Sequence, residues 1–266
     1  MDRSEMINSF YDGYYEDKRL DRSRHGQLEY RTTMHFIHRF LPGAGRILEL
    51  GAGTGRYSVA LAREGYSVTA VELAERNLAL LRQNAGDLEN LTAISGDAVD
   101  LSRFADDSFD LTLSLGPMYH LYEEAERAAA LREAVRVTRP GGVILTAFLS
   151  VHAILWDNYL RGNLAEGLEE NFDADFRVRH FQEQLFTAYD IPELEALFQS
   201  LPVTLLKIAA ADGPLELAEG RADFAMSDAE FERYVQYHLR FCECRELLGG
   251  SAHLLHICRK KQQTVG

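Results

Sequence analysis

The chain has 266 residues, of which 46% are hydrophobic and 26% are charged, and its formal net charge is −13. This composition is ordinary for a soluble globular protein, and the length is ample for one buried core. An acidic surface repels phosphate backbones, which disfavours a general nucleic-acid binder. No apolar run approaches the roughly 18 residues of a membrane span, and the N-terminus lacks the apolar core of a signal peptide. We therefore expect a cytoplasmic protein with no membrane partner.

The cysteines also favour a cytoplasmic location. The three cysteines lie within residues 242–258 and are too few for a disulfide framework, which suits a reducing compartment. Histidines lie nearby in residues 238–256, but no CxxC pair or repeated ligand spacing accompanies them. We therefore expect no metal site.

Residues 1–40 are predicted to form a helical prefix, and from Arg46 onward short apolar runs alternate with helical patterns. The predicted strands are 46–50, 67–73, 91–95, 108–116 and 143–150. The predicted helices between them are 56–65, 74–86 and 123–142, the last stopped by Pro140 and two glycines. Strands this apolar, separated by helices, predict an α/β fold with a mostly parallel sheet covered on both faces.

The alternation breaks at residues 151–182, which have helical stretches and the only tryptophan but no strand–helix rhythm. It resumes with helices at 190–200 and 228–248 and strands at 203–210 and 252–260. No repeat or low-complexity tract divides the chain, so we expect one domain: a sheet core with two candidate covers, 1–40 and 151–182.

A glycine turn follows the first predicted strand, which ends at Leu50. Glycines occupy alternate positions in "LGAGTGRY", where a backbone can approach a ligand closely and adopt positive φ. Ligands of open α/β sheets bind at such carboxyl ends of strands. A dinucleotide fingerprint would need glycine where Arg56 stands, and the Gly-Lys-Ser/Thr of a P-loop is absent. The turn alone leaves a structural role and an unusual dinucleotide site open.

Glu72 ends the second predicted strand, beside the turn. A carboxylate there can accept hydrogen bonds from both ribose hydroxyls of a nucleoside. The alternative is a solvated carboxylate at the end of a strand.

Several segments occur in an order and spacing that resemble class I S-adenosylmethionine (SAM)-dependent methyltransferases: "ILELGAGTGRYSVALA", "VTAVELAERNL", "ISGDAVDL", "SFDLTLSLGPMYHL" and "LREAVRVTRPGGVILTAF". The resemblance covers roughly residues 40–150, and "LGPMYHL" is similar to the small-molecule branch of quinone and secondary metabolism. It implies a doubly wound, seven-stranded, Rossmann-like sheet with an antiparallel last strand. It also implies a SAM-binding core at 41–150, an acceptor lid at 151–182 and the rest of the sheet at 183–266.

The resemblance also implies a set of donor-binding residues. The amino-acid half of SAM would be lined by Glu49, Gly51, Ala52, Gly53 and Gly55. The adenosine would be held by Glu72 at the ribose hydroxyls, Leu73 on the adenine, Asp97 at the adenine amino group and Ala98 through its backbone N–H. Leu115 and Gly116 would lie beneath the methionine portion and face the acceptor. Asp97 also fits a helix N-cap, and the two roles can coexist.

Methyl transfer from a sulfonium is an in-line displacement that needs alignment and exclusion of water. A base is needed only where the acceptor must lose a proton. His120, just after the fourth predicted strand, is the best candidate base, and capping or packing of the next helix is its alternative role. Tyr119 is a candidate for orienting the acceptor or SAM. His152 and His180, in the insertion, are weaker candidates.

The two covers supply further candidates. Tyr11, Tyr14 and Tyr15 share one helical face, where they either pack or edge the SAM pocket. Arg31 matches the methionine carboxylate of SAM, and a surface ion pair is equally consistent with it. The insertion has aromatic residues that would line an acceptor pocket or form the insertion's own core: Trp156, Tyr159, Phe172, Phe176 and Phe181.

The leading hypothesis is a SAM-dependent methyltransferase that acts on an O, N or S nucleophile of a small molecule and releases S-adenosylhomocysteine. Methylation of a protein or RNA is an alternative, but the acidic balance and "SLGP" disfavour it, because amino-methylating nucleic-acid enzymes typically have an Asn/Asp-Pro-Pro-aromatic tetrad there. A SAM-binding protein without transferase activity is a second alternative.

Overall fold

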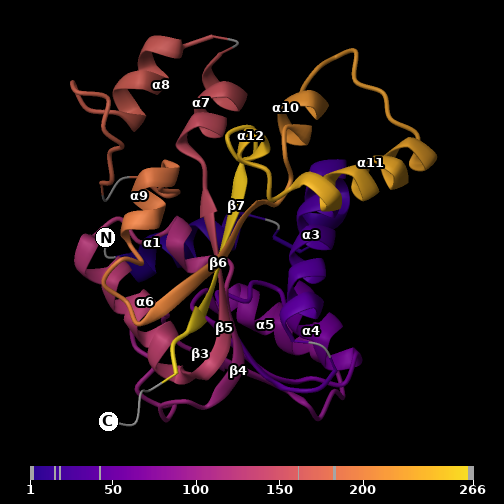
Figure 1. Ribbon diagram of the computed structural model, residues 1–266, viewed down its shortest axis with the longest axis vertical. Helices are drawn as coiled ribbons and strands as arrows, with labels where there is room; N and C mark the ends of the chain where they lie inside the picture. The colour runs from indigo at the N-terminus through magenta and orange to yellow at the C-terminus, as the bar shows by residue number, and fades with distance from the viewer. Residues whose placement is uncertain are drawn as a thin grey trace.

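The computed structural model describes residues 3–14, 16–17, 19–41, 43–160, 162–181 and 184–262. Within these residues, seven strands form one sheet in the order β3-β2-β1-β4-β5-β7-β6 (Figure 1). The strands are β1 (Arg46–Leu50), β2 (Ser67–Glu72), β3 (Leu91–Ser95), β4 (Phe109–Ser114), β5 (Thr138–Leu149), β6 (Val203–Ala210) and β7 (His253–Lys260). Strands β1 to β5 pair in parallel, and β7 is antiparallel to both β5 and β6. The predicted fold class is confirmed.

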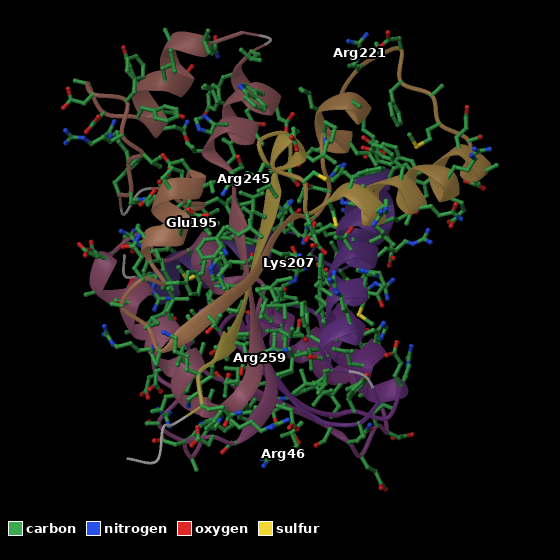
Figure 2. The ribbon with its side chains drawn as sticks, viewed as in Figure 1. Arg46, Glu195, Lys207, Arg221, Arg245 and Arg259 are labelled. Carbon is green, nitrogen blue, oxygen red and sulfur yellow. The ribbon has the colours of Figure 1, made fainter. Side chains whose placement is uncertain are left out.

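Apolar side chains cover both faces of the sheet because successive residues of a strand point to opposite sides. Ile47 and Leu111 belong to a core cluster with residues of α3 (Arg24–Phe40), α4 (Arg56–Arg63) and α5 (Glu75–Ala85). Leu48 of β1 and Ile144 of β5 belong to a second core cluster on the other face of the sheet. They pack there with residues of α6 (Glu124–Val137), α9 (Ile191–Ala196) and α12 (Arg245–Leu248). Side chains fill both layers, while Arg46 and Arg221 lie exposed at opposite ends of the molecule (Figure 2).

The remaining helices stand around the carboxyl ends of the parallel strands. They are α1 (Arg3–Gly13), α2 (Arg19–Arg22), the short 3-10 helix η1 (Pro117–Tyr119), α7 (Val151–Tyr159), α8 (Leu164–Asn171), α10 (Leu215–Glu219) and α11 (Asp228–Phe241). Helices α7 and α8 rise away from the sheet (Figure 1). Among the described helices, none combines the length and the apolar character needed to cross a membrane.

Several predicted boundaries differ from the structure, and two of these differences have a clear local cause. The helix predicted over 228–248 breaks after Phe241, because the carbonyl of Cys242 turns to accept a hydrogen bond from the backbone of Ala210 in β6. The helix predicted over 123–142 ends at Val137 as α6. Thr138 then turns extended, with its hydroxyl donating to the carbonyl of Ala134, and opens β5. Proline and glycines that were expected only to stop a helix therefore lie within a strand.

Candidate functional site

A cavity of about 270 Å³ lies at the carboxyl ends of β1, β2 and β4, with α1 across it. Most residues that the sequence singles out line it: Glu49, Gly51, Ala52, Gly53, Glu72, Leu73, Asp97, Ala98, Leu115, Gly116, Tyr119 and His120. Segments that are far apart in the chain thus meet at the edge of the sheet where ligands of this fold class bind.

The glycine turn has the backbone shape that its spacing predicts. Gly51, Gly53 and Gly55 have φ angles of +65°, +56° and +87°, a region that side chains strongly disfavour. A Cβ on Gly51 would lie 2.8 Å from Pro117, so only glycine permits this close approach. Gly55 is not among the lining residues. A Cβ there would lie 2.9 Å from Leu81 of α5, so Gly55 serves helix packing behind the turn.

Glu72 is fixed at the centre of the cavity by backbone donors. Its Oε2 accepts from Gly53 N at 2.7 Å and its Oε1 accepts from Ala74 N at 2.8 Å. The residue is only 5% exposed, and burial raises the pKa of its carboxyl group to about 7. One N–H at each oxygen leaves lone pairs on both for a ligand's hydroxyl groups.

Glu49 lies deeper, on β1, where it accepts a hydrogen bond from the hydroxyl of Ser58. Burial raises the pKa of its carboxyl group to about 8, and the nearby charge of Glu72 adds to that shift. The cavity therefore has two acids whose ionisation falls near neutral pH.

We expect Glu49→Gln to flatten the pH dependence of stability. The folded pKa of about 8 lies above the ordinary value of 4.5 for a glutamate, so this group's stabilisation is fully present below about pH 4.5 and is lost as pH rises through about 8. Glutamine imitates the protonated acid at every pH. Urea unfolding at pH 5, 6.5 and 8 should show the variant gaining stability relative to the wild type as pH rises. A constant difference would contradict the assignment.

Asp97 connects the cavity to the N-terminal cover. Its Oδ1 accepts from Val99 N at 3.2 Å, and its Oδ2 pairs with Arg3 of α1 at 2.5 Å. Arg3 also pairs with Glu126 at 3.1 Å. The guanidinium of Arg3 therefore links α1 both to Asp97 in the cavity lining and to Glu126 of α6.

His120 has a defined orientation. Its Nδ1 lies 2.8 Å from the carbonyl oxygen of Leu185, which can only accept, so Nδ1 bears the proton. Burial lowers the pKa of His120 to about 4, so the ring is neutral near pH 7. Its Nε2 then has a free lone pair, which accepts from the hydroxyl of Tyr11 at 3.2 Å.

Aromatic residues of α1, with Tyr14 just after it and Phe186, form the mouth of the cavity. Phe10 stacks on Tyr14 with ring centroids 5.0 Å apart, and Phe186 meets Phe10 edge-on at 5.4 Å. Tyr11 and Tyr14, for which the sequence left packing and the edge of a pocket open, both line the cavity. Tyr15 lies outside the described residues, so its predicted role stays untested.

Arg31 does not reach the cavity. Its guanidinium pairs with Glu232 of α11 at 2.6 Å in an exposed position, which is the surface ion pair of the two predicted alternatives. The arginines that do line the cavity include Arg19 of α2 and Arg56 of α4.

None of the described residues of 151–182 lines this cavity. Phe172 instead packs with Val151 and Ala188 in a small separate core, and His152 stacks on Trp156 and Phe172. The insertion's other aromatics are likewise absent from the lining: Tyr159 bonds Glu170, Phe176 is 71% exposed, and Phe181 contacts Arg179. His180 pairs with Glu193. Residues of α1 and Phe186 line the cavity instead.

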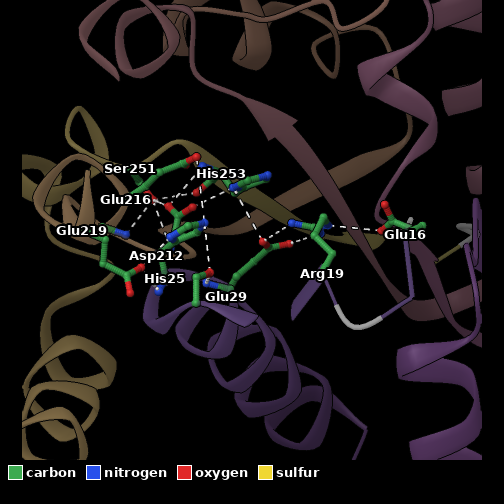
Figure 3. A network of polar contacts seen from close by, with 12 residues as sticks. Glu16, Arg19, His25, Glu29, Asp212, Glu216, Glu219, Ser251 and His253 are labelled. Carbon is green, nitrogen blue, oxygen red and sulfur yellow. Dashed lines mark hydrogen bonds and ion pairs between the residues drawn. The ribbon is translucent and has the colours of Figure 1, made fainter. Parts of the chain in front are cut away.

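Sequence reasoning missed a charged network beside the cavity (Figure 3). Arg19 forms a fork with Glu29 at 2.9 and 3.0 Å, Glu29 lies 3.7 Å from His253, and His253 pairs with Asp212 at 2.7 Å. Its members come from α2, α3, β7 and the loop after β6. No local spacing joins them, so the sequence offered no signal for this network.

Residues 48–146 match the family described as a methyltransferase domain. A demethylmenaquinone methyltransferase of Clavibacter sepedonicus is 42% identical over 106 residues, which make up 39% of this chain and 41% of that protein. The chain thus spans about two fifths of the length of the curated relatives it matches.

Two solved structures share the fold. The PH0226 protein of Pyrococcus horikoshii OT3 aligns with a TM-score of 0.61 and 18% identity, over 95% of this chain and 99% of that chain. The second is the 1,6-didemethyltoxoflavin-N1-methyltransferase of Burkholderia thailandensis, which was solved with 1,6-didemethyltoxoflavin and S-adenosylhomocysteine. It aligns with a TM-score of 0.59 and 19% identity, over 98% of this chain and 87% of that chain. The matched segment, the strand order and the cavity agree: residues 48–146 are similar to the methyltransferase domain family, and the sheet has the fold of the two solved structures.

Proposed function

We propose that this protein transfers the methyl group of SAM to a nucleophilic atom of a small molecule bound in the same cavity. The single observation that carries the proposal is the carboxylate of Glu72, buried in the cavity and aimed by two backbone donors with lone pairs to spare. A ribose with two adjacent hydroxyls is the ligand that such a group recognises.

The donor would then lie along the carboxyl ends of the strands. Asp97 and Ala98, after β3, would hold the adenine beside Leu73, while Gly51 and Gly53 would face the methionine portion. The acidic side chains nearby suit a ligand with a positively charged sulfonium. These assignments follow the family resemblance, and the lining of the cavity supports them.

A small acceptor is supported by the closure of the cavity. Helix α1 lies across it, and Phe10, Tyr14 and Phe186 narrow its mouth. The relative and the structural neighbour named above act, by their names, on demethylmenaquinone and 1,6-didemethyltoxoflavin, both small molecules. A protein or RNA segment would have to displace α1.

Chemistry at the acceptor would be mainly alignment, with His120 as the base where the acceptor must lose a proton. The Nε2 lone pair of the neutral ring, which accepts from the Tyr11 hydroxyl in this structure, would accept from the acceptor's hydroxyl in its place, and the Leu185 carbonyl would stabilise the imidazolium that forms. Acceptors that are already unprotonated would not need this step.

Isotope-labelled SAM tests the proposal directly. The full chain is incubated with labelled SAM and a cell metabolite extract, and products are separated by size and by mass spectrometry. We expect a labelled small molecule. Label confined to protein or RNA would contradict the small-molecule assignment, and saturable binding without label transfer would leave only a SAM-binding protein.

We expect His120→Ala to slow turnover on a hydroxyl acceptor by about 10²–10⁴-fold, the usual contribution of a general base. Affinity for SAM should stay within about twofold of the wild type, because His120 lies toward the acceptor end. Turnover is measured by steady-state kinetics with the acceptor that the labelling experiment identifies. Affinity for SAM is measured separately by calorimetry. Unchanged turnover would return His120 to a packing role.

A further inference from the structure

The start of β7 brings a histidine to the wall of the cavity. His253 pairs in register with Leu149 at the end of β5, and both residues line the cavity. Its Nδ1 lies 2.7 Å from Asp212 Oδ2 and 3.7 Å from Glu29 Oε2. These two carboxylates raise the pKa of His253 to about 9 despite its burial, so the ring is an imidazolium at pH 7.

An imidazolium has two N–H donors, and only one of these is used here. Nδ1 donates to Asp212, whereas no hydrogen bond joins Nε2 to any part of the chain that the structure describes. In Figure 3 the ring of His253 points this nitrogen away from the charged network. The cavity wall therefore offers an unused N–H donor.

The network behind this donor has no excess of positive charge. Arg19 and His253 supply two positive charges, Glu29 and Asp212 supply two negative ones, and a third carboxyl group, that of Glu16, pairs with Arg19 at 3.2 Å. Arg19 is already paired with Glu29, and His253 is already paired with Asp212. The carboxylates therefore need no metal ion to balance them, and no positive charge is left over to bind the carboxylate of a ligand. The network offers hydrogen bonds to an uncharged or weakly charged oxygen.

A second unused donor lies beside the first. Tyr119 lines the cavity with its ring centroid 5.9 Å from that of His253. The residue is 8% exposed, and its hydroxyl is buried with no hydrogen-bond partner among the described residues. Burying an unpaired hydroxyl is unfavourable, so a ligand oxygen that reaches it recovers free energy.

These donors lie at the end of the cavity away from the adenosine side. Glu72 is on β2, and β7 is four strand spacings away, about 19 Å. The mouth of the cavity is apolar and aromatic, with Phe10 stacked on Tyr14 at an interplanar angle of 20° and Phe186 edge-on to it. Aromatic faces of this kind pack against flat rings.

We propose that Tyr119 and His253 form the oxygen-binding end of the acceptor site, and that the acceptor is a flat ring compound with a keto or phenolic oxygen. The inference rests on the proposed function and adds the acceptor class. His253 and Tyr119 are specificity-determining residues in this arrangement, and His120 keeps its separate role.

Two isosteric probes test the assignment: 1-naphthol, which presents an oxygen, and 1-methylnaphthalene, which presents a methyl group in its place. Calorimetry on the full chain saturated with S-adenosylhomocysteine should show 1-naphthol binding about tenfold more tightly, as expected for hydrogen bonds to a charged and a neutral donor. In Tyr119→Phe the preference should fall to about threefold or less, with an unchanged or higher melting temperature because an unpaired buried hydroxyl is removed.

Tyr66→Phe is the matched control, because its hydroxyl donates to the Leu41 carbonyl, outside the cavity. It should keep the full preference for 1-naphthol. Nitrogen-15 NMR gives a readout at His253 without a substitution: its Nε2–H signal should shift with 1-naphthol and stay in place with 1-methylnaphthalene.

Equal affinity for both probes in the wild type would overturn the inference, and so would a Tyr119→Phe variant that keeps the wild-type preference. Weaker binding of S-adenosylhomocysteine by Tyr119→Phe would assign this wall to the donor's carboxylate, which also overturns it. Failure of the wild type to bind S-adenosylhomocysteine at all would contradict the proposed function itself.

Discussion

Glu29→Ala is expected to destabilise the protein by about 3–5 kcal/mol, the usual cost of removing one partner from a buried ion pair. The side chain is buried and accepts both ends of the Arg19 fork, and it lies 3.7 Å from His253. Its loss would remove both bonds of the fork and leave Arg19 with only its 3.2 Å contact to Glu16. Urea unfolding at pH 7 measures the change in the free energy of unfolding.

Glu232→Ala is the control for this prediction. Glu232 also pairs with an arginine, Arg31, but both side chains are solvent-exposed and screened. We expect its unfolding curve to overlay that of the wild type. A Glu29→Ala variant as stable as this control would show that the buried network contributes little to folding.

Glu72→Ala is expected to weaken SAM binding by about 1–3 kcal/mol, or about 5- to 150-fold, because hydrogen bonds to a charged group are lost. The substitution also removes the acceptor for Gly53 N, so the glycine turn loses the contact that fixes it. Calorimetry measures the affinity, and Glu75→Ala, on the exposed side of α5, is the control. Unchanged affinity would remove Glu72 from the donor site.

The same carboxylate predicts how SAM binding depends on pH. Because the pKa of Glu72 is about 7 in the free protein, the acid must lose its proton to accept both ribose hydroxyls. Affinity should therefore fall by up to about tenfold for each pH unit below 7 and level off above it. Glu72→Gln should bind weakly at every pH and lose this slope, which separates the effect from ionisation of SAM itself.

Local patterns were enough to predict the sheet. The bounds predicted for 46–50, 91–95 and 203–210 agree with β1, β3 and β6, because each is a short apolar run between turn residues. The glycine turn and Glu72 were equally accessible, since both depend on a strand end and the residues beside it. These features are set by neighbours in the sequence.

The rest of the cavity wall could not be predicted in the same way. Arg19 and Arg31 are both arginines of the N-terminal helices, and which of them faces the cavity depends on how α3 packs: its Arg31 meets α11, whereas Arg19 meets Glu29. The insertion at 151–182 follows β5, where an acceptor lid was expected. Its apolar residues found partners in one another and in Ala188 instead, which keeps them away from the cavity. Such choices are made by tertiary contacts that no short pattern contains.

Arg3 fastens α1 to Asp97 and Glu126, and α1 supplies Ile7, Phe10 and Tyr11 to the cavity. Under the proposed function, these two ion pairs hold α1 over the donor site, so breaking them would open that side of the cavity for exchange of the donor.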